Sequence, residues 1–178
     1  EHVIDEPEHD GKLKIVELKT EPKGRIFPKA KEAIMAAEMV ILGPGDLYTS
    51  VLATVVVDDV AGLLRQTQAR LVYVMNLMTR WGQTYGFTAA DHLREVEKYI
   101  GREMDAVVVN QAVLPVDVVE KYKTTRAEPV EDDLGADKRV VRADVLSPVE
   151  VERQAGDTLS RSLLRHDPDK LARVVINL

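Results

Sequence analysis

Three short apolar runs constrain the fold of this chain most strongly: residues 39–43 (MVILG), 71–76 (LVYVMN) and 104–111 (MDAVVVNQ). Segments with helical periodicity separate these runs, and in the clearest of them Thr88 can cap the helix and Gly101 can end it. Strands that are apolar on both faces and alternate with helices are typical of a parallel sheet covered on both sides. The sequence therefore predicts an α/β fold with a mostly parallel sheet.

The remaining predicted elements complete a single α/β domain over residues 1–178. Pro28 suits the first turn of one helix, and Asp167 suits the cap of another. The segment that follows the first apolar run predicts a helix with an irregular, β-branched centre. Further strands are expected at 13–19 and 138–146, and helices at 28–38, 47–68, 88–101, 115–123 and 167–178.

Composition and charge narrow the classes of function. Of the 178 residues, 45% are apolar and 30% are charged, as in a soluble globular domain. The net charge of −6 and the lack of clustered Lys and Arg argue against nucleic-acid binding. The absence of cysteine excludes disulfides, thiolate metal sites and a cysteine nucleophile, and it fits a cytoplasmic location. No apolar run is long enough to span a membrane, so no membrane association is expected.

The turn at residues 43–50 (GPGDLYTS) is the first candidate site, because ligands of open parallel sheets bind beyond the carboxyl ends of the strands. Glycines let backbone N–H groups approach an anion, and the start of the next helix adds partial positive charge. A tight turn capped by Asp46 or Thr49 explains the same pattern equally well, so both interpretations stay open. The candidate ligand-binding residues here are Gly43, Pro44, Gly45, Asp46, Leu47, Tyr48, Thr49 and Ser50.

The long polar loop at residues 76–88 is the second candidate site. Connections in such folds usually have about two to six residues, and longer loops often carry function. Asn76 and Thr79 could bind the hydroxyl or phosphate groups of a ligand, and Trp81 is either a lid or a contact for a partner. The candidate set also includes Met78 and Thr84 from this loop, and Asn110 from the end of the third apolar run.

Asp91 and His92 are the candidates for acid–base chemistry. His92 lies just inside the start of a predicted helix, where the helix dipole disfavours its cationic form. Neighbours on a helix point in different directions, so the two are not an evident dyad, and a surface or capping role for His92 is the simpler interpretation. No metal-ligand spacing is present, although a magnesium ion shared between phosphates and Asp46 would need none.

Two residues in the second half of the sequence complete the candidate set. Tyr122 could stack on a base or a sugar, although packing at a helix end is the simpler explanation. Arg165 could pair with a phosphate, although a surface position before the Asp167 cap is again the simpler explanation.

Three segments taken together resemble the YvcK-like family of gluconeogenesis factors, which is related to the CofD family of 2-phospho-L-lactate transferases. The segments are VILGPGDLYTSVL (40–52), VYVMNLMTRWGQTYGFTAADHL (72–93) and DAVVVNQ (105–111), and their order and spacing match that family. The resemblance covers nearly the whole chain. It implies a three-layer α/β/α, Rossmann-like fold.

The resemblance also implies a function. YvcK-like proteins bind UDP-sugars such as UDP-N-acetylglucosamine and influence cell shape and cell-wall synthesis on gluconeogenic carbon sources. The transferase relatives imply the alternative, a magnesium-dependent transfer of a phospholactyl group to a deazaflavin precursor, so whether this chain is an enzyme stays open. By this resemblance, residues 43–50 and the loop from Asn76 line the ligand cleft, and Tyr122 and Arg165 match UDP-sugar contacts. A homodimer is the default expectation.

The sequence departs from the family pattern in several places. The Gly-rich first strand of the family (GGGTG) and its DDGGS segment are absent, so the chain is expected to be the C-terminal part of a longer protein. Asp46 replaces the usual Ser and places a negative charge beside the expected phosphate site. Gln83 replaces an acid, which argues against any role that requires that carboxylate.

Overall fold

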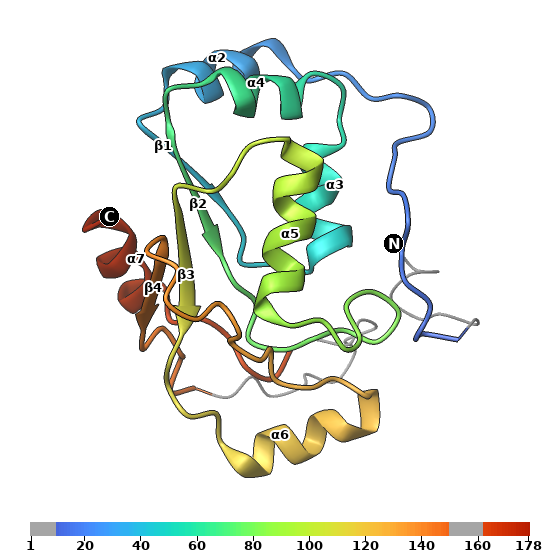
Figure 1. The fold of residues 1–178 in the computed structure, drawn as a ribbon, viewed down its shortest axis with the longest axis vertical. Coiled ribbons are helices and arrows are strands. Elements are labelled where there is room, and N and C mark those ends of the chain that lie inside the picture. Colours follow the sequence, from blue (N-terminus) through green and yellow to red (C-terminus); the bar gives the residue numbers. More distant parts are fainter. Residues whose placement is uncertain (1–9, 150–161) are drawn as a thin grey trace.

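A computed structural model describes residues 10–149 and 162–178, and it contains a four-stranded sheet in which all neighbouring strands are parallel (Figure 1). The strand order follows the chain, β1-β2-β3-β4. The strands are β1 (Met39–Leu42), β2 (Arg70–Val74), β3 (Ala106–Asn110) and β4 (Val140–Ala143). The prediction of a parallel sheet built on the three apolar runs is confirmed.

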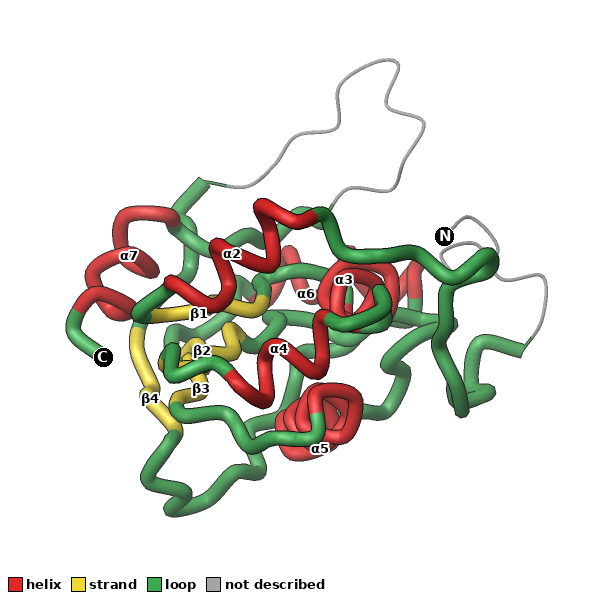
Figure 2. Tube along the Cα trace, turned by 90° about the horizontal axis from the view of Figure 1, so that it is seen from above, coloured by secondary structure: helices red, strands yellow, loops and turns green. Residues whose placement is uncertain are grey.

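Helices lie on both faces of the sheet, which gives the three layers of an α/β/α fold (Figures 1 and 2). On one face, Tyr73 and Val107 share a core cluster with Val96 of α5. On the other face, Val72 packs in a cluster with Val175 of α7. None of the helices in the described residues is long and apolar enough to cross a membrane. The helices are α2 (Pro28–Ala36), the π-helix η1 (Leu47–Leu52), α3 (Ala53–Val55), α4 (Val60–Gln66), α5 (Ala89–Ile100), α6 (Val116–Tyr122), the 3-10 helix η2 (Lys123–Thr125) and α7 (Pro168–Ile176).

The predicted caps at Thr88, Gly101 and Asp167 are confirmed, whereas Asp46 lies at the N-cap of η1 without a side-chain capping hydrogen bond. The Thr88 hydroxyl accepts a hydrogen bond from the backbone N–H of Asp91, and the Asp91 carboxylate accepts one from the backbone N–H of Thr88. Gly101 ends α5 with φ of 74°, a left-handed conformation that favours glycine. The Asp167 carboxylate accepts hydrogen bonds from the first backbone N–H groups of α7.

Three predicted elements were wrong in type or extent, and one of them is the strand predicted over 138–146, which is limited to β4 (Val140–Ala143). Residues 13–19 do not form a strand, although Ile15 and Leu18 pack against the core and Val16 is 85% exposed. The Leu18 N–H donates to the Tyr99 hydroxyl of α5 at 2.8 Å instead of to a neighbouring strand. The helix predicted over 47–68 is divided into η1, α3 and α4, and the left-handed Asp59 (φ 76°) lies at the start of α4.

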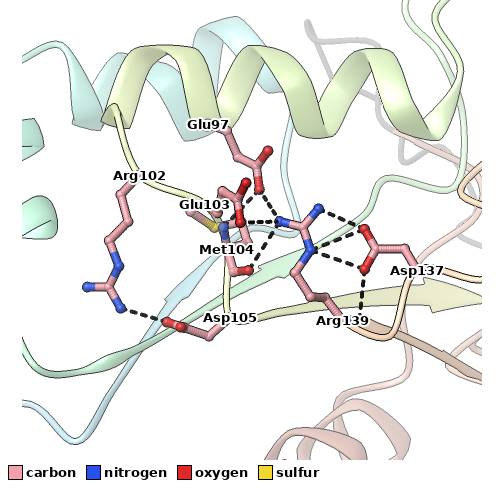
Figure 3. Close-up of polar contacts among 7 residues, drawn as sticks. All are labelled: Glu97, Arg102, Glu103, Met104, Asp105, Asp137 and Arg139. Atoms are coloured by element: carbon pink, nitrogen blue, oxygen red, sulfur yellow. Dashed lines mark hydrogen bonds and ion pairs between the residues drawn. The ribbon is translucent and has the colours of Figure 1, made fainter.

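Ion pairs join the sheet to α5 at the amino ends of β3 and β4, opposite the end where ligands are expected (Figure 3). The Arg139 guanidinium lies 2.7 Å from Glu97 of α5 and 2.7 Å from Asp137. Hydrogen bonds from Arg139 hold the pKa of the Asp137 carboxyl at about 2. Arg102 pairs with Asp105 at 2.8 Å, and that carboxylate also accepts the Leu71 N–H of β2. This network joins the strands to α5, and none of its residues lines the two cavities at the other end of the sheet.

Candidate functional site

A cleft of about 950 Å³ lies beyond the carboxyl ends of β1 and β2. Its walls come from the turn after β1, the loop after β2, the end of α6 with η2, and the segment that leads into α7. Figure 1 shows α6 lying past the end toward which the strand arrows point. The lining residues are Pro44, Gly45, Asp46, Asn76, Leu77, Met78, Thr79, Arg80, Trp81, Lys121, Tyr122, Thr124, Thr125, Ala127, Ser162, Leu163, Leu164, Arg165 and His166.

The turn after β1 is fixed by its contacts with β2 and the loop after it. Gly43 has φ of 87°, and a Cβ atom there would lie 2.8 Å from the Val74 carbonyl oxygen. Only glycine therefore fits without a shift of the strand or the turn. The Asn76 side-chain oxygen accepts the Gly45 N–H at 3.2 Å. Asn76 thus joins the two loops that the sequence had singled out separately.

Charge in the cleft is predominantly positive. Arg80, Lys121 and Arg165 contribute cationic side chains, and Asp46 is the one acidic side chain among the described lining residues. The Nε atom of Arg80 lies 3.8 Å from Oδ2 of Asp46. Thr84 does not line the cleft, but its hydroxyl accepts the Arg80 N–H at 2.9 Å and so helps to place Arg80.

The loop after β2 is held by a short antiparallel pairing with the chain after η2. The Thr79 N–H donates to the Glu128 carbonyl at 2.7 Å, and the Thr79 hydroxyl accepts the Glu128 N–H at 2.9 Å. Met78 pairs with Pro129 in the same bridge. These contacts bring Met78 and Thr79 to the cleft wall together with residues far along the chain.

Tyr122 has the packing role that the simpler explanation predicted, while it also lines the cleft. Its side chain is nearly buried, and its hydroxyl accepts the Leu164 N–H at 2.9 Å. This bond holds the segment before α7 against α6. In the same segment, the Nε2 atom of His166 lies 3.1 Å from the Met75 carbonyl oxygen. Burial lowers the pKa of His166.

The π-helix η1 turns much of the first candidate segment away from the cleft. Leu47 and Tyr48 are buried in the core, and the Tyr48 hydroxyl donates to Glu95 at 3.1 Å. Burial raises the pKa of this phenol. Thr49 accepts a hydrogen bond from the Gln83 amide at 3.3 Å. Ser50 is exposed outside the cleft lining, so only Pro44, Gly45 and Asp46 of the eight residues line it.

Asp91 and His92 lie in α5, outside the residues that line the cleft. The surface position expected for His92 is wrong, because its side chain is fully buried and its ring packs edge-on against Phe87. Its Nδ1 lies 2.9 Å from the Thr88 carbonyl oxygen, and Nε2 has no partner among the described residues. Burial lowers the pKa of His92. The Asp91 carboxylate caps α5 and pairs with Arg94 at 2.7 Å.

Asn110 also lies outside the cleft lining, at the end of β3. Its side-chain oxygen accepts the Val145 N–H at 3.2 Å, and its amide donates to the Ala112 carbonyl at 2.9 Å. Asn110 therefore braces two neighbouring loops against each other.

Several cleft residues were not predicted from the sequence. Lys121, Thr124 and Thr125 are near neighbours of Tyr122, so the spacing around that residue was the available signal. Arg80 and Trp81 lie in the loop that was singled out, but only Trp81 was considered as a contact. Ser162 and His166 flank Arg165, and nothing in their local pattern indicated a site. The ligand-binding roles predicted for Pro44, Gly45, Asp46 and the other candidate residues that line the cleft stay predictions.

Without a ligand phosphate, the described cleft residues do not offer a complete magnesium site. Mg²⁺ is usually held by one or two carboxylates together with substrate phosphates. Asp46 is the one carboxylate among the described lining residues, and it lies beside the Arg80 guanidinium. Among the described residues, no group of three or more His, Cys, Asp or Glu side chains converges.

Comparison with known proteins places the chain among related sequences and structures. The sequence profile described as "2-phospho-L-lactate transferase CofD" matches residues 1–149. The gluconeogenesis factor of Bacillus subtilis is 31% identical over 173 residues, covering 97% of this chain and 52% of that protein. A Thermotoga maritima protein predicted to be a gluconeogenesis factor is 33% identical over 167 residues, covering 91% of this chain and 50% of that protein.

A solved structure supports the same relationship. The crystal structure of a UPF0052 family member from Bacillus halodurans superposes with a TM-score of 0.78 at 30% identity. It covers 92% of this chain and 50% of the other. The chain thus spans about half the length of the relatives that it matches.

Proposed function

The chain belongs to the CofD family and its gluconeogenesis-factor (UPF0052) relatives, and from this premise we propose that it binds a UDP-sugar in the cleft, as a regulator. UDP-N-acetylglucosamine is the ligand we expect. The proposal extends to a cytoplasmic role in cell shape and cell-wall synthesis on gluconeogenic carbon sources, which the resemblance to YvcK-like proteins implies.

The charge of the cleft carries the proposal. Three cationic side chains (Arg80, Lys121 and Arg165) and one acidic side chain line the described part of the cleft, in a chain whose net charge is −6. This excess of positive charge suits a diphosphate, because a guanidinium group can donate two parallel hydrogen bonds to phosphate oxygens. Its position beyond the carboxyl ends of parallel strands is where nucleotides bind in folds of this kind.

Neutral groups in the cleft suit the remainder of a nucleotide sugar. Hydroxyl groups of Thr124, Thr125 and Ser162 could bond with sugar hydroxyls. The Tyr122 ring and the apolar Met78 side chain supply surface for a base or a sugar face. A volume of about 950 Å³ lies at the upper end of the usual range for small-molecule sites.

Calorimetry with the full natural protein tests the proposal. We expect saturable binding of UDP-N-acetylglucosamine, weaker binding of UDP alone, and no change of the ligand after incubation. Arg165→Gln should weaken binding by about tenfold, because a charge-assisted pair with phosphate is lost. Arg173→Gln is the matched control, since Arg173 is exposed on α7 and outside the cleft. Absence of binding at millimolar ligand would overturn the proposal.

The description of the matching family profile favours a second candidate, a phosphotransferase of the 2-phospho-L-lactate type. Asp91 and His92 were the acid–base candidates, but they lie outside the cleft lining. A transfer assay with a deazaflavin acceptor, a phospholactyl donor and added magnesium tests this candidate. Formation of the phosphodiester product, followed by mass spectrometry, would place the transferase ahead of the regulator.

A further inference from the structure

A second, smaller cavity of about 430 Å³ lies beside the cleft, with Trp81 and Ala127 shared by both. We propose that it binds an oxyanion group, a phosphate or a carboxylate, of a small metabolite. We call it the basic pocket. Its side chains are Lys12, Trp81, Tyr85, Lys123, Arg126 and Glu128, with Ala127 completing the wall.

Arg126 is held in place before any ligand binds. Its guanidinium lies over the Trp81 ring, 4.4 Å from the ring centroid. Tyr85 packs edge-on against the same ring, with centroids 4.8 Å apart. Arg126 also adopts a left-handed conformation (φ 55°), which a non-glycine residue rarely adopts. A cation fixed on an aromatic wall loses less conformational entropy when it meets an anion.

Lys12 lies at the same pocket because its neighbour Gly11 packs against the Trp81 ring. A Cβ atom on Gly11 would lie 2.2 Å from an atom of the indole ring, so only glycine fits at this contact. The Gly82 N–H donates to the Gly11 carbonyl at 3.2 Å and fixes the same approach. Trp81 therefore has Gly11 packed against it and Arg126 over its ring, and it organises cations from two distant segments.

Lys123 and Arg126 belong to one tight turn, since the Arg126 N–H donates to the Lys123 carbonyl at 3.1 Å. Among the described residues, neither Lys12 nor Arg126 takes part in an ion pair. Lys123 pairs with Glu120 at 2.6 Å, but both side chains are more than half exposed. Exposed pairs of this kind contribute little, so a ligand can replace Glu120.

The balance of charge favours an anion with more than one negative charge. Three cations face the single carboxylate of Glu128. Two hydrogen bonds between the Glu128 backbone and Thr79 keep this residue beside the pocket. The ring of Trp81 is already in contact with Gly11, Tyr85 and Arg126, so we expect charge and not stacking to hold the ligand.

Calorimetric titrations of the full natural protein with pyrophosphate and, separately, with citrate test the proposal. The two probes compare the binding of a phosphate ligand with that of a carboxylate ligand. Each titration is repeated in the presence of saturating UDP-N-acetylglucosamine. We expect saturable binding of at least one probe in both conditions. Lys123→Gln and Arg126→Gln should each weaken it by about threefold to tenfold. Glu128→Gln should strengthen it, and Lys138→Gln, an exposed lysine outside both cavities, should leave it unchanged.

Gly11→Ala adds a test that alters no charge. The added methyl group should displace the Lys12 turn from Trp81 and weaken anion binding, while circular dichroism checks that the fold is retained. Fluorescence of Trp81, identified by its loss in Trp81→Phe, should change on anion binding because Arg126 lies on the ring.

Three results would overturn the proposal: no saturable binding below about 10 mM, binding that the Lys123 and Arg126 variants leave unchanged, or competition between the probes and the UDP-sugar. The last result would assign the anion to the cleft. Failure of UDP-sugar binding alone leaves the basic pocket intact, because the probes are tested without it.

Discussion

The Nε atom of Arg80 lies 3.8 Å from Oδ2 of Asp46, so the loop after β2 supplies a cation to the acid in the turn after β1. Their side chains are 25% and 31% exposed. The sequence raised the concern that Asp46 would repel a phosphate at this turn. The structure shows that a protein cation lies beside this charge.

Replacement of Asp46 by Ser, the residue usual in the family, tests how this pair affects binding. If no metal takes part, we expect UDP-sugar affinity to rise by about threefold to tenfold, because the variant removes the negative charge beside the expected phosphate site. If magnesium takes part, the variant should instead lose any magnesium dependence. Calorimetry with and without magnesium measures both, and Glu32→Gln on α2 is the control. Unchanged affinity and metal dependence would show that residues 43–46 only turn the chain.

Asn76 joins the two loops of the cleft, and we expect Asn76→Ala to cost about 1 kcal/mol of stability through loss of its bond to the Gly45 N–H. It should also weaken UDP-sugar binding several-fold, because Gly45 is then less well positioned. Asn110→Ala is the matched control, since Asn110 also braces two loops but lies outside the cleft lining. Urea unfolding and calorimetry should show that Asn110→Ala lowers stability without a comparable loss of affinity.

Gly43→Ala should destabilise the protein more than Gly135→Ala. Both glycines have positive φ, 87° and 57°, so both variants place alanine in a left-handed conformation. A methyl group on Gly43 also meets the Val74 carbonyl oxygen at 2.8 Å, whereas nothing lies within 4 Å of one on Gly135. We expect an extra loss of about 1–3 kcal/mol for Gly43→Ala in urea unfolding. Equal losses would contradict the close packing of this turn on β2.

Stability should fall as the pH is lowered through the range in which histidine titrates. Burial lowers the folded-state pKa values of His92 and His166 below the ordinary value of 6.5. Below about pH 6.5 the unfolded chain therefore binds more protons, so the stabilisation is present above this pH and is lost as the pH falls through the folded-state values.

Urea unfolding between about pH 7.5 and pH 5 measures this dependence above the range in which the acidic groups titrate. His92→Gln should reduce the slope of the free energy of unfolding against pH, and His166→Gln should remove the contribution of the second histidine. A slope that His92→Gln leaves unchanged would mean that the buried ring is not the group responsible.

Arg139→Gln should raise the pKa of Asp137 from about 2 toward its usual range. The hydrogen bonds from the guanidinium stabilise the carboxylate form, and the variant removes them. NMR titration of the Asp137 carboxyl carbon measures the change. Arg142→Gln is the control, because Arg142 pairs with Asp132 and lowers the pKa of that group instead. If the pKa of Asp137 stays near 2 in Arg139→Gln, the Arg139–Asp137 contacts drawn in Figure 3 do not account for its low value.

Predictions from the sequence succeeded where the determinants are local. The apolar runs gave β1, β2 and β3, and Thr88 placed the start of α5 correctly. Residues 13–19 were wrongly predicted to form a strand, because an apolar pattern does not indicate whether the backbone of a segment pairs with the sheet. Two side chains of this segment pack on the core, but its backbone does not join the sheet.

Periodicity, capping and motif order depend on neighbouring residues, so they were enough to predict the α/β class, the family and the two loops that meet in the cleft. Which side chains face that cleft depends on the packing of distant segments. The π-helix η1 buries Tyr48 in the core, and α5 buries His92 there. Arg80 comes to lie beside Asp46 through contacts that span 34 positions of the chain. Packing sets such long-range proximities, and no local pattern in the chain specifies them.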